Sequence, residues 1–207
     1  MDNRLFFSAT KRNRECIGEL LSRILITKGF VLEIGSGSGE HGVAFQKSFP
    51  EITWQSSDPE LIHRNSISAW IEHEELNFKM PQPLDIDVEK IPWEIPSELR
   101  LSIQGIISIN MIHIASWNCT KSLFNESSKL LKNGQFLMLY GPFKIGNKHM
   151  SQSNELFDGS LKMQNKSWGV RDLREVSKEA SKNGFIEEEI IRMPANNFSV
   201  IYRKGSL

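Results

Sequence analysis

The segment from Val31 to Glu40 constrains the fold more than any other part of the chain, because an apolar strand there runs into a glycine-rich turn. Its sequence is VLEIGSGSGE, in which Gly35, Gly37 and Gly39 alternate with serine. Glycine has no Cβ, so the backbone can turn tightly at positive φ and approach a ligand closely. A strand, a glycine-rich turn and a helix in this order are typical of α/β proteins that bind a nucleotide-like cofactor.

Glu33 lies inside this strand, two residues before the first glycine. A dehydrogenase whose turn receives a pyrophosphate usually has an uncharged residue here, whereas an acid suits a ligand with positive charge. S-adenosylmethionine (SAM) carries a sulfonium and an ammonium, so the acid favours SAM and methyl transfer. We expect Glu33 to orient the methionine ammonium, directly or through water. The turn residues expected to contact the cofactor are Gly35, Ser36, Gly37 and Gly39.

Strands and helices alternate along the remaining sequence. The expected strands are 30–34, 52–56, 80–84, 105–109, 135–140, 185–191 and 198–202, and the expected helices are 17–25, 40–48, one from Pro59, one ending near 131, 153–163 and 171–182. The join between the last two strands is too short for a parallel crossover, so this pair must be antiparallel. The pattern predicts an α/β fold with one Rossmann-like open sheet, mostly parallel with a C-terminal antiparallel hairpin, and helices on both faces.

The weakest expected strand is 80–84, since Pro81 and Pro83 remove ladder donors and place it at a sheet edge. The 207 residues suffice for one domain. Within it, we expect 1–28 to form an N-terminal cover segment and helix. The polar stretch 141–168 is interpreted as a substrate lid.

The charge balance argues for a small-molecule substrate. Lysine plus arginine (25) equals aspartate plus glutamate (25), so no net field attracts nucleic acid or an anionic membrane. Cys16 and Cys119 are far apart and outside any C-x-x-C, which excludes a disulfide framework and a cysteine zinc site. No histidines and carboxylates have metal-ligand spacing, so no metal is expected. Without a signal core or a spanning apolar run, the expected location is cytoplasmic, and the oligomeric state is left open.

Residues that follow the strands are the expected ligand contacts, because open α/β sheets bind ligands at the carboxyl ends of their strands. Asp58 lies 19 residues past Gly39, a spacing typical of a carboxylate that accepts the ribose hydroxyls. It could also simply cap the following helix. Asp85 is placed to accept from the adenine amino group, or is a loop carboxylate. Asn110 and Met111 follow the fourth strand and are expected in the cofactor pocket, although Asn110 could instead cap a turn.

Three residues are candidates for catalysis. His113 follows the fourth strand and could act as a general base or bind substrate, but it could also pack against Trp117. His149 in the lid has similar alternatives, and Tyr140 ends the fifth strand. Methyl transfer from a sulfonium is an in-line displacement that mainly needs a positioned nucleophile and exclusion of water, so no catalytic triad is required.

Several sequence blocks resemble known methyltransferases. VLEIGSGSGEH, SSDP after the second strand, LDI after the third and KNGQFLMLYGPF at the fifth resemble the class I SAM-dependent methyltransferases. Over nearly the full chain, FSATKRN, SISAWI, NMIHIASW, LYGPFK, SNELFD, WGVRDL and MPANN resemble the methyltransferase-like protein 26 family, which more often has proline after the serine of FSAT. The resemblance implies a class I methyltransferase fold, SAM as cofactor and S-adenosylhomocysteine as product. It also implies an N-terminal segment folded over the cofactor, which makes Arg12 and Asn13 cofactor-pocket candidates. It supplies neither a substrate nor a catalytic residue.

Two alternative functions are consistent with the sequence. Gly37, Gly39 and Gly42 match G-x-G-x-x-G, as in an NAD(P)-dependent oxidoreductase, but this match leaves Gly35 and Glu33 unexplained. A SAM-binding sensor or scaffold without turnover is the other alternative, because no essential base is identified.

Overall fold

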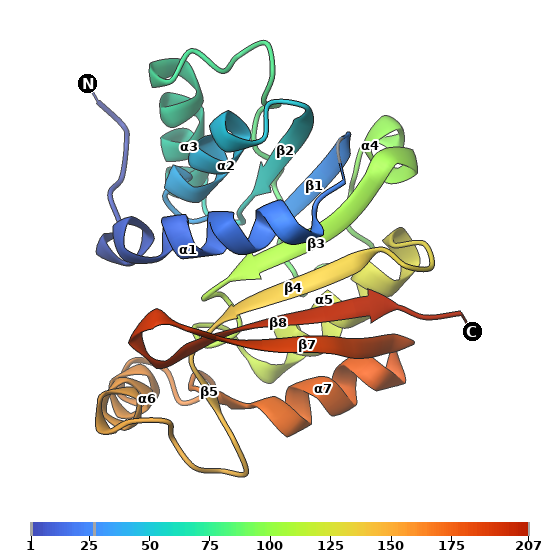
Figure 1. The fold of residues 1–207 in the computed structure, drawn as a ribbon. Coiled ribbons are helices and arrows are strands. Elements are labelled where there is room, and N and C mark those ends of the chain that lie inside the picture. Colours follow the sequence, from blue (N-terminus) through green and yellow to red (C-terminus); the bar gives the residue numbers. More distant parts are fainter. Residues whose placement is uncertain (1, 27, 207) are drawn as a thin grey trace. The chain divides into compact units, whose positions relative to one another are not determined.

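The computed structural model describes residues 2–26 and 28–206, and the chain divides into two compact units, residues 1–107 and 108–207 (Figure 1). Both units combine strands with helices. Strand β3 (Ile103–Ile109) begins in the first unit and ends at the start of the second.

The first unit is built on a parallel sheet. Its other elements are α1 (Ser8–Ile24), β1 (Gly29–Ile34), α2 (Glu40–Ser48), β2 (Ile52–Ser57), α3 (Leu61–His73) and α4 (Ser97–Ser102). β1 is central and pairs in parallel with β2 and with β3. The sequence therefore predicted β1, α2 and β2 to within one residue at each end. α1 begins well before the expected residue 17.

Helices cover both faces of this sheet, as expected. On one face α2 approaches β2 so closely that a Cβ on Gly42 would lie 2.6 Å from the Ser56 hydroxyl oxygen. The Phe45 ring packs on Trp54 there, with 5.0 Å between ring centroids. On the other face, one apolar space is lined by Phe30 and Leu32 of β1 together with Leu99 of α4. Every second residue of β1 thus faces the opposite layer.

The expected strand 80–84 is wrong. Only Leu84 pairs with the sheet, through an isolated parallel bridge to Ser57 at the outer side of β2. The Leu84 N–H donates to the Ser56 carbonyl (3.0 Å), and its own carbonyl accepts from the Asp58 N–H (3.1 Å). Pro81 and Pro83 have no N–H to extend this pairing. The position at the sheet edge was correct, but the prolines reduce the strand to one residue.

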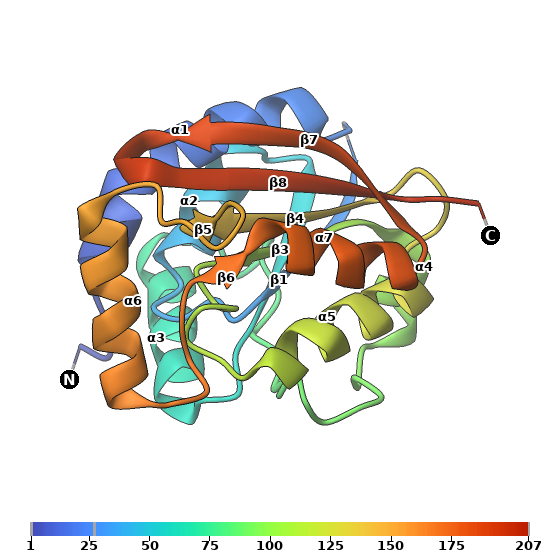
Figure 2. The ribbon, with the colours of Figure 1, turned by 90° about the horizontal axis from the view of Figure 1, so that it is seen from below.

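The second unit contains the predicted antiparallel hairpin. Its elements are α5 (Trp117–Leu130), β4 (Phe136–Gly141), β5 (Phe143–Lys144), α6 (Gln152–Gln164), β6 (Arg171–Asp172), α7 (Leu173–Lys182), β7 (Phe185–Met193) and β8 (Asn197–Lys204). β8 lies between β4 and β7 and is antiparallel to both. Helices α5 and α7 lie side by side, and α7 packs along β7 (Figure 2).

Segment 141–172 contains structure that the sequence did not predict. β5 and β6 pair in parallel as a separate two-stranded sheet, with Phe143 opposite Arg171. The expected helix of this segment is present as α6. Asp172 ends β6, and its carboxylate accepts from the Arg174 N–H (2.9 Å), which fixes the start of α7 two residues later than predicted.

Among the helices of the described residues, we find none with the length and apolar character that a bilayer span requires.

Candidate functional site

The glycine-rich turn between β1 and α2 adopts a backbone that requires glycine. Gly35, Gly37 and Gly39 all have positive φ, at 71°, 57° and 89°. A Cβ on Gly39 would lie 2.8 Å from the side chain of Ile67 and 2.9 Å from its Cα. The Ser36 N–H donates to the Ser57 carbonyl (2.9 Å), which ties the turn to the end of β2. The predicted cofactor turn is therefore a rigid element joined to the neighbouring strand.

Asp58, the predicted ribose acceptor, lies directly beside this turn. Its Oδ2 accepts a hydrogen bond from the Gly37 N–H (2.9 Å), and its Oδ1 accepts one from the Glu60 N–H (3.0 Å). The Nδ1 of His63 lies 2.9 Å from Oδ1. The carboxylate is buried, with 4% of the residue exposed. Asp58 thus braces the glycine turn and holds the backbone at Glu60, the N-cap residue of α3. Its contact with a ribose stays a prediction.

His63, to which the sequence analysis assigns no role, is the side-chain partner of Asp58. The five-residue spacing between Asp58 and His63, across the start of a helix, is the only sequence signal that could have revealed the pair. Pro59 lies in the turn between them. It does not start the helix, because α3 begins at Leu61 with Glu60 as its N-cap.

Glu33 is fully buried under α2. Its Oε2 accepts hydrogen bonds from the Trp54 indole N–H (3.0 Å) and from the Ser56 hydroxyl (3.3 Å). Burial raises the pKa of the Glu33 carboxyl to about 7, against the opposing effect of these hydrogen bonds. The carboxyl therefore lies among side chains of β2 and is close to half protonated at neutral pH.

The N-terminal segment covers the glycine turn. The Phe7 ring lies against Gly37 so closely that a Cβ there would be 2.9 Å from the ring carbon Cε2. The Phe7 N–H donates to Oε2 of Glu40 (2.7 Å), the same oxygen that accepts from the Ser38 hydroxyl (2.9 Å). A carboxylate at the start of α2 thus joins the cover segment to the turn. Sequence reasoning assigned no role to Phe7 or Glu40.

The structure separates the two other N-terminal candidates. The side chain of Asn13 is buried, and its Oδ1 lies 2.8 Å from Nε2 of His41. Burial lowers the pKa of His41 to about 4, so its ring is neutral at neutral pH and donates from Nε2 to Asn13. Arg12, by contrast, is exposed on α1. Asn13 belongs to the surroundings of the turn, and Arg12 lies at the surface.

Asp85 is the most exposed of the predicted acids. Its side chain is 67% exposed and forms an ion pair with Arg64 of α3 (2.9 Å). The same guanidinium donates to the Asp58 carbonyl (2.9 Å). Arg64 therefore connects Asp85 to the end of β2, near the ribose candidate.

In the second unit, the residues after β3 and at the end of β4 are joined through the backbone. Asn110 has φ 58°, and its N–H donates to the Tyr140 carbonyl (2.8 Å). Met111 opens a turn in which its carbonyl accepts from the Ile114 N–H (3.0 Å). Tyr140 is buried, and its hydroxyl accepts from the Asn197 side-chain amide (3.1 Å). Tyr140 therefore has the environment of a core residue.

His113 is the most unusual residue of this unit. It is 1% exposed, and within the described residues neither ring nitrogen has a hydrogen-bond partner. Burial lowers its pKa to about 3, so the ring is neutral. Its ring contacts the edge of Phe143 at 5.4 Å between centroids, whereas Trp117 lies against Arg171.

Gly141 makes room for the imidazole. A Cβ on Gly141, whose φ is 154°, would lie 2.1 Å from Nε2 of His113. Gly141 directly follows the expected strand 135–140, and His113 follows the expected strand 105–109. Because Gly141 has no side chain, the His113 ring can be buried against it.

His149, the third catalytic candidate, is hydrogen-bonded to an acid. Its Nε2 lies 3.0 Å from Oδ2 of Asp158, a buried residue of α6. No group of three or more histidine, cysteine, aspartate or glutamate residues in the described part of the chain is arranged to hold a metal ion.

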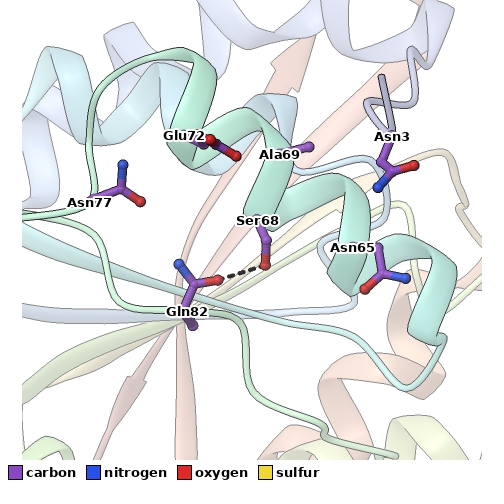
Figure 3. A pocket seen from close by; sticks show the side chains of 7 residues that line it. All are labelled: Asn3, Asn65, Ser68, Ala69, Glu72, Asn77 and Gln82. Atoms are coloured by element: carbon purple, nitrogen blue, oxygen red, sulfur yellow. Dashed lines mark hydrogen bonds between the residues drawn. The ribbon is translucent and has the colours of Figure 1, made fainter. Parts of the chain in front are cut away.

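The first unit has two surface hollows. One, of about 410 Å³, runs along α3, and Figure 3 shows the hydrogen bond from the Ser68 hydroxyl to Gln82 (2.6 Å) inside it. Its lining residues are Asn3, Asn65, Ser68, Ala69, Glu72, Asn77 and Gln82. The other, of about 360 Å³, lies along α2 and includes Arg14 and Trp70. No predicted site residue lines either hollow.

Solved methyltransferases share this fold. The mitomycin 7-O-methyltransferase MmcR is 13% identical with a TM-score of 0.78, and covers 96% of this chain and 56% of its own. An O-methyltransferase family protein from Burkholderia thailandensis is 12% identical with a TM-score of 0.77, covering 96% and 58%. Human N-acetylserotonin methyltransferase, solved in complex with SAM, is 15% identical with a TM-score of 0.73, covering 96% and 53%.

The chain therefore spans between 53% and 58% of the length of these three proteins. At such identities the likeness shows the fold, which is the predicted α/β class I methyltransferase fold with a mostly parallel sheet. A family model described as a protein of unknown function (DUF938) matches residues 4–204, and the chain belongs to that family.

Proposed function

We propose that the protein is a SAM-dependent methyltransferase that acts on a small molecule. The observation that carries the proposal is the hydrogen bond from the Gly37 N–H to the buried Asp58 carboxylate. It places a carboxylate that could accept from ribose hydroxyls beside a turn of glycines, which have no Cβ to keep a ligand from the backbone. When bound, SAM supplies an activated methyl group, and S-adenosylhomocysteine is the product.

The residues of the first unit fit the adenosyl and amino-acid parts of such a cofactor. A carboxylate has about four lone-pair sites, so Asp58 retains capacity for a ribose hydroxyl beside its two backbone donors and His63. Glu33, near the end of β1, is the acid proposed to orient the methionine ammonium, directly or through water. Asp85, Asn13, Asn110 and Met111 remain proposed contributors to the pocket, and exposed Arg12 is the weakest of the proposed contacts.

His113 is our candidate for holding the methyl acceptor. A buried neutral imidazole without a hydrogen-bond partner can accept a hydrogen bond from a hydroxyl or amine of the acceptor. Removing water from the nucleophile and fixing its direction is the main work of methyl transfer. Tyr140 is bonded to Asn197 within the core, so we assign it a packing role.

We also infer kinship with the methyltransferase-like protein 26 family, from the sequence blocks quoted above. The small-molecule acceptor is supported by the names of the structural neighbours, which refer to mitomycin and N-acetylserotonin.

Calorimetric titration of SAM tests the cofactor. We expect Gly37→Ala to weaken SAM binding at least tenfold, because a Cβ at φ 57° both strains the backbone and meets Phe7. Gly134→Ala is the matched control, since Gly134 also has positive φ but open space around its Cβ position. Asp58→Ala should weaken binding as well.

Equal SAM affinity in wild type, Gly37→Ala and Asp58→Ala would refute the assignment of the site. Tight NADH binding without SAM binding would favour an oxidoreductase. Labelled SAM incubated with a metabolite extract separates an enzyme, which yields a labelled product, from a sensor or scaffold that binds without turnover.

A further inference from the structure

A cluster of charged side chains surrounds Asp158 in the second unit. The Asp158 side chain is only 3% exposed, and two lysines and a histidine converge on its Oδ2. Lys162 Nζ lies at 2.6 Å, His149 Nε2 at 3.0 Å and Lys144 Nζ at 3.9 Å. The other oxygen, Oδ1, accepts from the Val170 N–H (2.7 Å). We call Lys144, His149, Asp158 and Lys162 the Asp158 cluster.

The cluster carries more positive charge than its acid can neutralise. Burial opposes ionisation of Asp158, but hydrogen bonds from Lys162, the Val170 N–H and His149 outweigh it and lower the pKa of the carboxyl. One carboxylate balances one of the two lysines, which leaves a surplus of one positive charge. In a chain of zero net charge, residues 141–172 hold five lysines or arginines against three acids.

The surplus charge faces solvent, and the carboxylate does not. The side chains of Lys144 and His149 are each 19% exposed and that of Lys162 is 53% exposed. An anion that approaches from solvent therefore meets ammonium and imidazole groups first. Partly buried cations that are already positioned bind anions better than mobile surface lysines, because less side-chain freedom is lost on binding.

The cluster is also joined to His113 on two sides. Phe143, the residue before Lys144, contacts the His113 ring. The Gly169 N–H donates to the His113 carbonyl (2.9 Å), and the next residue, Val170, donates to Asp158. An anionic group held by the cluster would thus be bound near His113, the residue proposed to hold the methyl acceptor.

We propose that the Asp158 cluster binds the phosphate or carboxylate group of the methyl acceptor, so that the substrate is an anionic small molecule. That the bound anion belongs to a methyl acceptor rests on the proposed methyltransferase function. The anion site itself does not depend on that function.

Calorimetric titration of inorganic phosphate into the full chain at low ionic strength tests the anion site. We expect millimolar binding that Lys144→Gln and Lys162→Gln each weaken at least fivefold. The matched control is Lys182→Gln, because Lys182 also pairs with one acid, Glu179, within a helix (2.8 Å) and is 59% exposed. A parallel titration with succinate separates phosphate from carboxylate recognition.

Absence of binding of both anions to the wild-type chain would overturn the proposal, as would equal weakening by Lys182→Gln. The same variants are titrated with SAM, whose affinity should not change. If the wild-type chain binds phosphate but not SAM, the methyltransferase proposal is contradicted and the anion site is supported. If it binds SAM but not phosphate or succinate, the anion site is contradicted and the methyltransferase proposal is unaffected.

Discussion

The glycine turn of the first unit and the His113 region of the second differ in how their buried polar groups are satisfied. At the turn, Asp58 accepts from two backbone N–H groups, and Glu33 accepts from an indole and a hydroxyl. At His113, two buried ring nitrogens have no partner among the described residues. Leaving a buried polar group unpaired costs about 1–3 kcal/mol. The buried acids of the first region therefore have partners within the chain, whereas the buried imidazole of the second has none among the described residues.

Burial also shifts the two titratable groups in opposite directions. It raises the pKa of Glu33 to about 7 and lowers that of His113 to about 3, because burial disfavours the charged form of each group. Each experiment below changes one of the two regions.

The largest effect is expected from Gly141→Ala. The added methyl group would overlap the His113 ring, and alanine is strained at φ 154°. We expect a loss of about 3 to 5 kcal/mol in the free energy of unfolding, measured by urea titration. Gly134→Ala, with positive φ but no close neighbour, should lose only about 1 kcal/mol.

The double variant Gly141→Ala with His113→Ala shows whether the imidazole is the cause. Recovery of about half the lost stability is expected when the ring is removed. Strictly additive losses would show that the two positions are not in contact.

Glu33→Gln should have the next largest effect, and it depends on pH. Because the folded-state pKa is higher than the ordinary 4.5, the stabilisation from a protonated Glu33 is fully present below pH 4.5 and is lost as pH rises through 7. The loss amounts to about 3 kcal/mol. The free energy of unfolding of Glu33→Gln, measured relative to that of the wild type, should therefore increase between pH 5 and pH 8.

A difference that stays constant over this range would show that Glu33 has an ordinary pKa. Glu98→Gln makes the same change at an exposed acid in the first turn of α4 and serves as the matched control.

The smallest effect is expected from His113→Leu. Removing an unpaired buried imidazole should leave the free energy of unfolding at pH 7 unchanged or raise it by about 1 kcal/mol. Since the folded-state pKa is below 6.5, the wild type loses stability as pH falls below 6.5, and the leucine variant should not lose this part. Urea titrations at pH 7 and pH 5 give both values.

A clear loss of stability at pH 7 would indicate that His113 has a partner in solution. Methyl transfer should decrease strongly in the same variant while SAM affinity is retained, and this combination distinguishes an acceptor-binding residue from a structural one.

Local sequence patterns predicted most elements of the fold. β1, α2 and the β7 and β8 hairpin follow from apolar runs, glycines and a short join, all of which act within a few residues of each other. The strand at 80–84 failed because Pro81 and Pro83 limit pairing to Leu84. The early start of α1 at Ser8 was missed because its first turns are polar and their position depends on contacts with α2, such as that of Asn13 with His41.

The candidate site was predictable only where it follows strand ends. Sequence placed Asp58 and the glycines correctly, because parallel strands bring their carboxyl ends together. It could not place Phe7 on Gly37, His63 on Asp58 or His113 on Gly141. These contacts depend on tertiary packing, and for His113 on a glycine 28 residues away whose only signal is a missing side chain.

The Phe7 ring on Gly37 has a consequence for residence times. The segment that carries it is held by three hydrogen bonds: from the Leu5 N–H to Ser66, from the Trp70 indole to the Leu5 carbonyl, and from the Phe7 N–H to Glu40. If the proposed cofactor lies under this segment, its release requires these hydrogen bonds to open. Its dissociation rate would then depend on the detachment of Leu5 and Phe7 as well as on its own contacts.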